Sequence, residues 1–124
     1  MYRIYNKDFY TEEEVIKYLR QQIVKSETIK VNYFDFQKRK TLILDNLIIV
    51  IDDEWWRMEI KNRRGEEFAT IRYHIADEIY SKHIRGLVLF CREQQKFKEE
   101  QKVLLKQQEL LKVKKAKVRR GRSR

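Results

Sequence analysis

Residues 47–61 read LIIVIDDEWWRMEIK, and this stretch decides the fold. The apolar run LIIVI is bounded by polar residues, a pattern typical of a strand buried on both faces. A short acidic turn follows, and beyond it apolar and polar residues alternate, as in a strand with one face toward the core. The alternation places Trp56, Met58 and Ile60 on one side and Trp55, Arg57, Glu59 and Lys61 on the other. The stretch therefore predicts a β-hairpin.

Upstream of the hairpin, the sequence predicts one helix and one strand. Thr11 and Glu14 form a capping box, and the apolar residues that follow fall on one helical face, so we expect an amphipathic helix over 12–25. The stretch TIKVNYFDF at 28–36 alternates and is rich in β-branched and aromatic residues, which predicts a strand. The residues QKRK at 37–40 are expected to form a charged loop.

Downstream of the hairpin, the pattern changes from strand to helix. FATIRYHI at 68–75 alternates and predicts a strand for part of its length, while the pattern from Tyr73 to His83 also suits a helix. RGLVLFCRE at 85–93 fits either a short buried strand or part of one long helix. From 93 to 117 the chain consists mostly of Gln, Lys, Glu and Leu, which favours a helix. Apolar residues recur every seven positions at Phe97, Leu104 and Leu111. This pattern favours a single helix that packs on the rest of the protein through one apolar stripe. It leaves open whether the chain forms a homodimer.

These elements predict an α+β fold, with an N-terminal helix on a small, mostly antiparallel sheet of three to five strands and a long C-terminal helix. The length of 124 residues corresponds to one small domain. We expect an α/β core at 1–92, a C-terminal helix at 93–113 and a disordered basic tail at 114–124.

Composition limits the setting in which the protein works. The single cysteine, Cys91, lies in an apolar run, which predicts a buried thiol and a reducing compartment. The first residues contain no apolar signal segment, and the longest apolar run is too short to span a membrane. We therefore expect a soluble, cytoplasmic protein that does not contact membranes.

The net charge of +10 is concentrated at the C-terminus. The last thirteen residues, KVKKAKVRRGRSR, hold eight of the 29 basic residues, which leaves 21 basic against 19 acidic residues in the rest of the chain. A basic tail of this density indicates a polyanionic partner, most often DNA or RNA. The alternative is a tail that only aids solubility.

Glu59 and Lys61 are the residues that point most specifically to a catalytic site. Two residues apart on a strand, they share one face. A carboxylate can hold a divalent cation there while the neighbouring lysine orients or deprotonates the attacking water. A second carboxylate is needed to hold Mg²⁺ well, and Asp45 lies fourteen positions upstream.

The order of elements resembles that of the PD-(D/E)xK nuclease superfamily, especially the archaeal-type Holliday-junction resolvases. In that family a helix with an acidic residue is followed by an aspartate strand, a (D/E)xK strand, a helix and a further strand. Over 12–92 the matching stretches are EEEVIKYL, LDNLIIVID, WWRMEIKNR, RYHIADEIYSKHIRG and LVLFC.

The resemblance implies a Mg²⁺-dependent endonuclease. Asp45 and Glu59 would be metal ligands, Lys61 the catalytic lysine, and Glu12 the acidic ligand on the helix, a role for which Glu13 and Glu14 compete. Leu44 stands where the family usually has Pro, which is a departure from the motif.

Each of these residues also has a structural interpretation. Glu59 and Lys61 can be charge partners on a solvated strand face. Asp45 and Asn46 favour turns, and Glu12 suits the positive end of a helix dipole. No zinc-ligand spacing and no glycine-rich phosphate loop occurs in the sequence.

Trp55 adds a separate indication, because a tryptophan on a polar strand face can stack on an unpaired base. The alternative is that the C-terminal helix covers it. The residues predicted to contact nucleic acid are Trp55, Arg57, Arg63, Arg64, Lys114, Lys115, Lys117, Arg119, Arg120, Arg122 and Arg124.

Two classes of function follow from the sequence. One is a nucleic-acid-binding protein with a candidate Mg²⁺-dependent nuclease site. The other is a non-catalytic phage or mobile-element accessory protein that binds a host nucleic-acid-processing complex.

Overall fold

The computed structural model describes residues 1–34, 38–74 and 76–122, without the side chains of Phe34, Ile79 and residues 109–122. The chain begins with a small hairpin, β1 (Tyr2–Ile4) and β2 (Lys7–Phe9), followed by α1 (Glu12–Lys25). Five strands follow: β3 (Lys30–Phe34), β4 (Arg39–Ile43), β5 (Ile48–Asp52), β6 (Arg57–Lys61) and β7 (Glu67–Arg72). A π-helical turn, η1 (Ile79–Ile84), leads directly into α2 (Arg85–Arg122).

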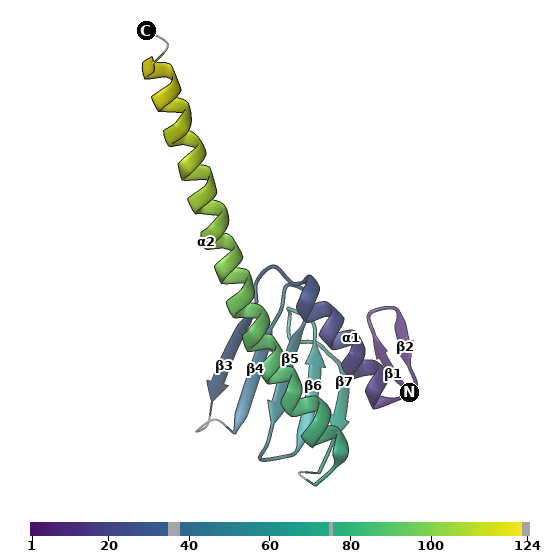
Figure 1. Ribbon diagram of the computed structural model, residues 1–124. Helices are drawn as coiled ribbons and strands as arrows, with labels where there is room; N and C mark the ends of the chain where they lie inside the picture. Colours follow the sequence, from purple (N-terminus) through teal and green to yellow (C-terminus); the bar gives the residue numbers. More distant parts are fainter. Residues whose placement is uncertain (35–37, 75, 123–124) are drawn as a thin grey trace.

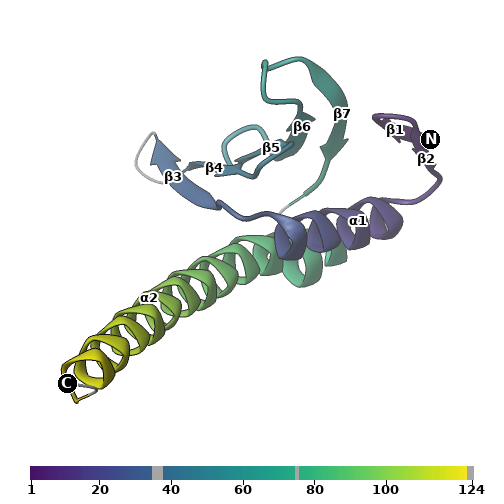
Figure 2. The same ribbon diagram turned by 90° about the horizontal axis from the view of Figure 1, so that it is seen from above.

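The five strands form one antiparallel sheet in which spatial order equals chain order, β3-β4-β5-β6-β7. The view from above shows both helices on the same face of this sheet (Figure 2). The predicted α+β fold, with its N-terminal helix, antiparallel sheet and long C-terminal helix, is confirmed.

The hydrophobic core lies between the sheet and the helices. Helix α1 begins at Glu12, where the hydroxyl of Thr11 accepts the backbone N–H of Glu14, as the capping box predicts. Both helices and the four strands β4–β7 bury apolar side chains, among them Val15, Leu19, Ile23, Leu42, Ile49, Ile51, Met58, Ile60, Ile71, Leu87 and Val88. Cys91 is also buried, and burial raises the pKa of its thiol to about 12.

Two expectations about the strands were wrong. Residues 39 and 40 lie in β4 rather than in a charged loop, because long basic side chains can lie on a strand while their charges reach solvent. The stretch LIIVI begins in the turn between β4 and β5, where the N–H of Leu44 donates to the carbonyl of Leu47 (2.8 Å). Within β5, Ile48 and Val50 are only half-buried, so this strand is covered on one face only.

The stretch LVLFC is helical, which resolves the alternative left open by the sequence. Leu87, Val88 and Cys91 are buried at positions i, i+1 and i+4, the spacing of one helical face. The strand that the resemblance implies at this place is therefore part of α2. The helix begins at Arg85 and extends to Arg122.

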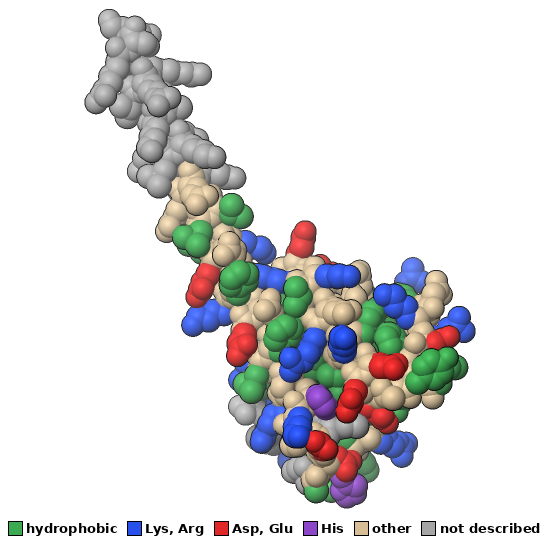
Figure 3. Space-filling model, turned by 45° about the vertical axis from the view of Figure 1, so that its right-hand side comes forward, with side chains coloured by type: hydrophobic (Ala, Val, Ile, Leu, Met, Phe, Trp, Pro, Cys, Tyr) green, Lys and Arg blue, Asp and Glu red, His purple; other side chains and the backbone are tan. Residues whose placement is uncertain are grey.

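Helix α2 is much longer than the sheet that it covers, and its C-terminal part projects past β3 (Figure 1). Large apolar side chains are exposed along α2, among them Phe97, Val103, Leu104 and Leu105, and Figure 3 shows apolar side chains on its projecting part. The buried apolar residues of α2, Leu87, Val88 and Cys91, lie near its start, and Lys98 further along still contacts the end of α1. Within the described residues, no helix combines the length and apolar character needed to cross a membrane.

Candidate nucleic-acid interface

The face of the sheet opposite the helices, which we call the outer face, collects charged side chains. Because paired residues on neighbouring strands project to the same side, the register fixes its membership. One row crosses the sheet through Thr41, Val50, Glu59 and Thr70, and the next through Arg39, Asp52, Arg57 and Arg72. A depression of about 510 Å³ lies on this face, lined by Arg39, Thr41, Val50, Asp52, Arg57, Glu59 and Lys61.

The acidic and basic side chains of the depression form two groups of ion pairs. Glu59 lies between two cations of its own strand, with Oε1 2.9 Å from Nε of Arg57 and Oε2 3.1 Å from Nζ of Lys61. In the other group, Nη2 of Arg39 donates to Oδ2 of Asp52 (3.2 Å). Each carboxylate therefore holds the cationic group of at least one neighbour in place.

The two kinds of charge lie at different depths. The side chains of Asp52 and Glu59 are only 4% and 16% exposed. Those of the three cations are 43%, 40% and 30% exposed for Arg39, Arg57 and Lys61. A molecule that approaches the outer face thus meets the cationic groups first, above carboxylates that it reaches less easily.

Asp52 also shapes the turn that joins β5 to β6. Its Oδ1 accepts the backbone N–H groups of Glu54 (3.0 Å) and Trp55 (3.2 Å). Trp56 has a left-handed backbone (φ 49°), and its carbonyl accepts the N–H of Tyr73 (2.9 Å). Trp55 is 68% exposed, so the alternative in which the C-terminal helix covers it is wrong.

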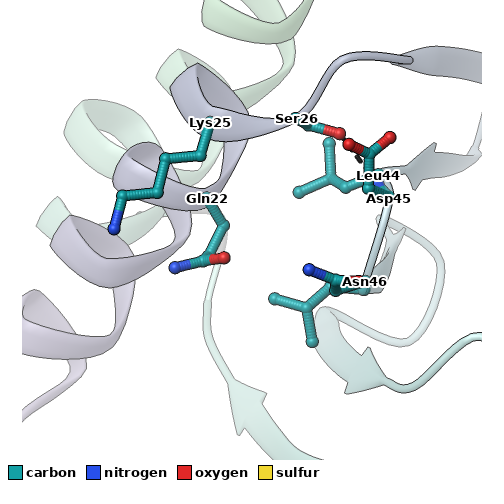
Figure 4. A pocket seen from close by; sticks show the side chains of 7 residues that line it. Gln22, Lys25, Ser26, Leu44, Asp45 and Asn46 are labelled. Atoms are coloured by element: carbon teal, nitrogen blue, oxygen red, sulfur yellow. Dashed lines mark hydrogen bonds between the residues drawn. The ribbon is translucent and has the colours of Figure 1, made fainter.

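Asp45 lies in a different environment from Glu59. Its carboxylate accepts the backbone N–H groups of Glu27 (2.7 Å) and Thr28 (3.1 Å), in the loop after α1. The hydrogen bond from Glu27 is the main reason that the pKa of Asp45 lies below its usual value. Figure 4 shows Asp45 beside Ser26, whose hydroxyl oxygen accepts the N–H of Asp45 (2.8 Å). These contacts are those of a turn residue that fastens a loop.

The structure does not assemble the predicted metal ligands. Asp45 contacts the loop after α1, Glu59 contacts the cations of β6, and Glu12 accepts a hydrogen bond from the hydroxyl of Tyr2 (2.9 Å). Across the part of the chain that the structure describes, no group of three or more His, Cys, Asp or Glu residues is arranged to hold a metal ion.

The other predicted contact residues have mixed outcomes. Arg57 lies in the depression, whereas Arg63 donates to the carbonyl of Leu44 (2.7 Å) and so braces the β4–β5 turn. Arg64 is exposed in the β6–β7 connection. The side chains predicted in the tail, from Lys114 to Arg122, and the whole of Arg124 lie outside what the structure describes.

Sequence reasoning missed the part of the outer face contributed by β4. The charged loop predicted at 37–40 includes Arg39, and Thr41 lies outside the predicted strands, whereas the structure places both in β4. The signal was present, because Arg39 and Thr41 alternate with the buried Leu42 once a strand is extended back to 39.

Comparison of the chain with protein-family models, with curated proteins and with solved structures gives no significant match. The candidate interface therefore rests on the geometry of this chain alone.

Proposed function

We propose that this protein binds nucleic acid through the outer face of its sheet. The observation that carries the proposal is the layering of charge in the depression, with the cations of Arg39, Arg57 and Lys61 more exposed than the carboxylates of Asp52 and Glu59. Phosphate groups are the natural partners of such cations, and arginine can bind two phosphate oxygens at once. The carboxylates beneath orient the cations before the ligand arrives, which reduces the entropy lost on binding.

The basic C-terminal segment supports the same proposal. Its eight Lys and Arg residues add sequence-independent attraction to a phosphate backbone. Contacts of this kind position a nucleic acid without reading its bases. We therefore expect affinity that falls steeply with salt and depends little on sequence.

A nuclease activity at Asp45, Glu59 and Lys61 remains a hypothesis that rests on the sequence alone. The geometry favours binding without cleavage, because Glu59 already has two cationic partners and Asp45 holds backbone N–H groups elsewhere. Within the proposal, Glu59 acts as a positioning carboxylate for Arg57 and Lys61.

An accessory role in a larger complex fits the same face. The exposed Trp55 and the apolar side chains of the projecting α2 offer contacts for a protein partner, while the outer face holds the nucleic acid.

The test is a salt series of binding measurements by fluorescence anisotropy with labelled oligonucleotides. Arg39→Ala and Arg57→Ala should each weaken binding. Each should also reduce the slope of log affinity against log salt concentration by the amount that corresponds to about one phosphate contact. Lys17→Ala, which removes an exposed cation from α1 in the helix layer, is the matched control and should change neither by as much. If the two arginine variants behave like the control, the outer face is not the binding surface.

A further inference from the structure

The lining of the depression contains one apolar residue, Val50, among charged and polar ones. The volume of the depression, about 510 Å³, falls in the range of ligand pockets, although the depression is open to solvent. The half-buried Val50 lies in the same row as Glu59, between the two groups of ion pairs. A half-buried apolar side chain among charged groups suits contact with a sugar or a base, whereas a duplex keeps its bases stacked inside and presents chiefly phosphates and groove edges.

Trp55 lies in the turn next to the depression. It lies three residues after Asp52 and two before Arg57, and both of these residues line the depression. An indole that is 68% exposed is unusual, because tryptophan is highly buried on average. Exposed aromatic rings beside cations are the means by which many proteins bind unpaired bases.

The turn that carries Trp55 is held firmly although its tryptophan is exposed. Asp52 accepts two of its backbone N–H groups, and the carbonyl of Trp56 is tied to the N–H of Tyr73. The ring of Trp56 packs against that of His74, with centroids 5.0 Å apart. The backbone at Trp55 is thus fixed before any ligand binds, which favours a stacking platform.

We infer that the outer face takes single-stranded nucleic acid, with phosphates on Arg39, Arg57 and Lys61 and an unpaired base stacked on Trp55. The inference rests on the proposed function and deepens it by naming the kind of strand. It requires charge on the ligand for the cations and a free base for the indole, and a single strand supplies both.

The experiment uses the full chain carrying Trp56→Phe, so that Trp55 is the only tryptophan and reports by its own fluorescence. Three ligands are titrated at equal salt: a single-stranded oligothymidine of about 12 nucleotides, a duplex of the same length, and heparin, a polyanion without bases. An oligouridine of equal length distinguishes RNA from DNA. Single strands should bind about tenfold more tightly than the duplex and quench Trp55, since stacking of one base is worth about that factor or more.

Substitution of the indole separates stacking from charge. Measured by fluorescence anisotropy of labelled oligonucleotides, because these variants lack the reporting indole, Trp55→Ala should weaken single-strand binding about tenfold and leave the duplex affinity nearly unchanged, while Trp55→Phe keeps most of the single-strand affinity. Because Trp55 is exposed, neither substitution removes core packing.

The possible failures are distinguishable. Equal affinity for single strand and duplex, or binding that ignores Trp55→Ala, overturns the inference and leaves the proposed function standing. Binding of heparin as tight as that of the single strand, with the same quenching, also overturns it. Binding to neither nucleic acid overturns both proposals.

Discussion

Oε2 of Glu59 lies 3.1 Å from Nζ of Lys61, two residues further along the same strand. A lysine this close satisfies the carboxylate by itself, and Arg57 holds the other oxygen. Glu59 thus forms ion pairs within its own strand, and its carboxylate positions the cationic groups of Arg57 and Lys61.

Titration calorimetry with Mg²⁺ and Mn²⁺ tests the catalytic alternative. We expect no saturable binding that depends on Glu59, because one carboxylate shared between two cations is a poor ligand for a further ion. Wild type and Glu59→Gln should therefore give the same heats, with and without a short DNA duplex. Saturable binding in the wild type that is lost in Glu59→Gln would restore the nuclease hypothesis.

Asp45→Asn should destabilise the fold by about 1 kcal/mol at neutral pH, since a charged acceptor of two backbone N–H groups is replaced by a neutral one. The folded-state pKa of Asp45 is lowered, so its stabilising effect is present above its ordinary pKa and is lost as the pH falls through the lowered value. Urea denaturation at neutral pH and in acid measures both effects, with exposed Glu99→Gln as the control. An equal loss for Asp45→Asn at both pH values would contradict this account.

Lys98 should stabilise the packing of α2 on α1. Its ammonium group donates to the carbonyls of Ile23 (3.1 Å), Val24 (2.9 Å) and Ser26, at the negative end of the α1 dipole. Lys98→Met should lower the free energy of unfolding by about 1–2 kcal/mol, because the carbonyls lose a charged donor. The same change at the exposed Lys102 should have little effect, and equal effects at both sites would show that the contact is not stabilising.

Neighbouring isoleucines of β5 test the assignment of the two sheet faces. Ile49 is fully buried against the helices, and Ile48 is half-buried on the outer face. Ile49→Ala should cost about 2–5 kcal/mol, the range for truncation of a core isoleucine, and Ile48→Ala clearly less. Similar losses in thermal or chemical unfolding would mean that a partner or the chain itself covers the outer face.

Features with local signals were predictable. Helix α1 has the predicted bounds because a capping box and a 3.6-residue period both lie within the segment. The hairpin of β5 and β6 follows from alternation and an acidic turn. The start of α2 was not predictable, because a short apolar run such as LVLFC has no periodicity that separates a strand from a helix. Its helical state depends on packing against α1 and the sheet.

The candidate site likewise has some features that the sequence predicts and others that it does not. That Glu59 and Lys61 share a face follows from the two-residue period of a strand. The position of Asp45 depends on backbone groups seventeen and eighteen residues away, at Thr28 and Glu27, for which the sequence carries no local signal. The layering of charge in the depression likewise depends on pairing between β4, β5 and β6.

In the five-stranded sheet each strand pairs with the next one along the chain, and this order has a consequence for folding. Every strand pair closes a short loop, so the loss of chain entropy on pairing is small at each step. The helix layer is different, since Lys98 meets carbonyls 72 to 75 residues earlier in the chain. We expect the hairpins to form early and the docking of α2 on α1 to come last, so that substitutions at this contact accelerate unfolding more than they slow folding.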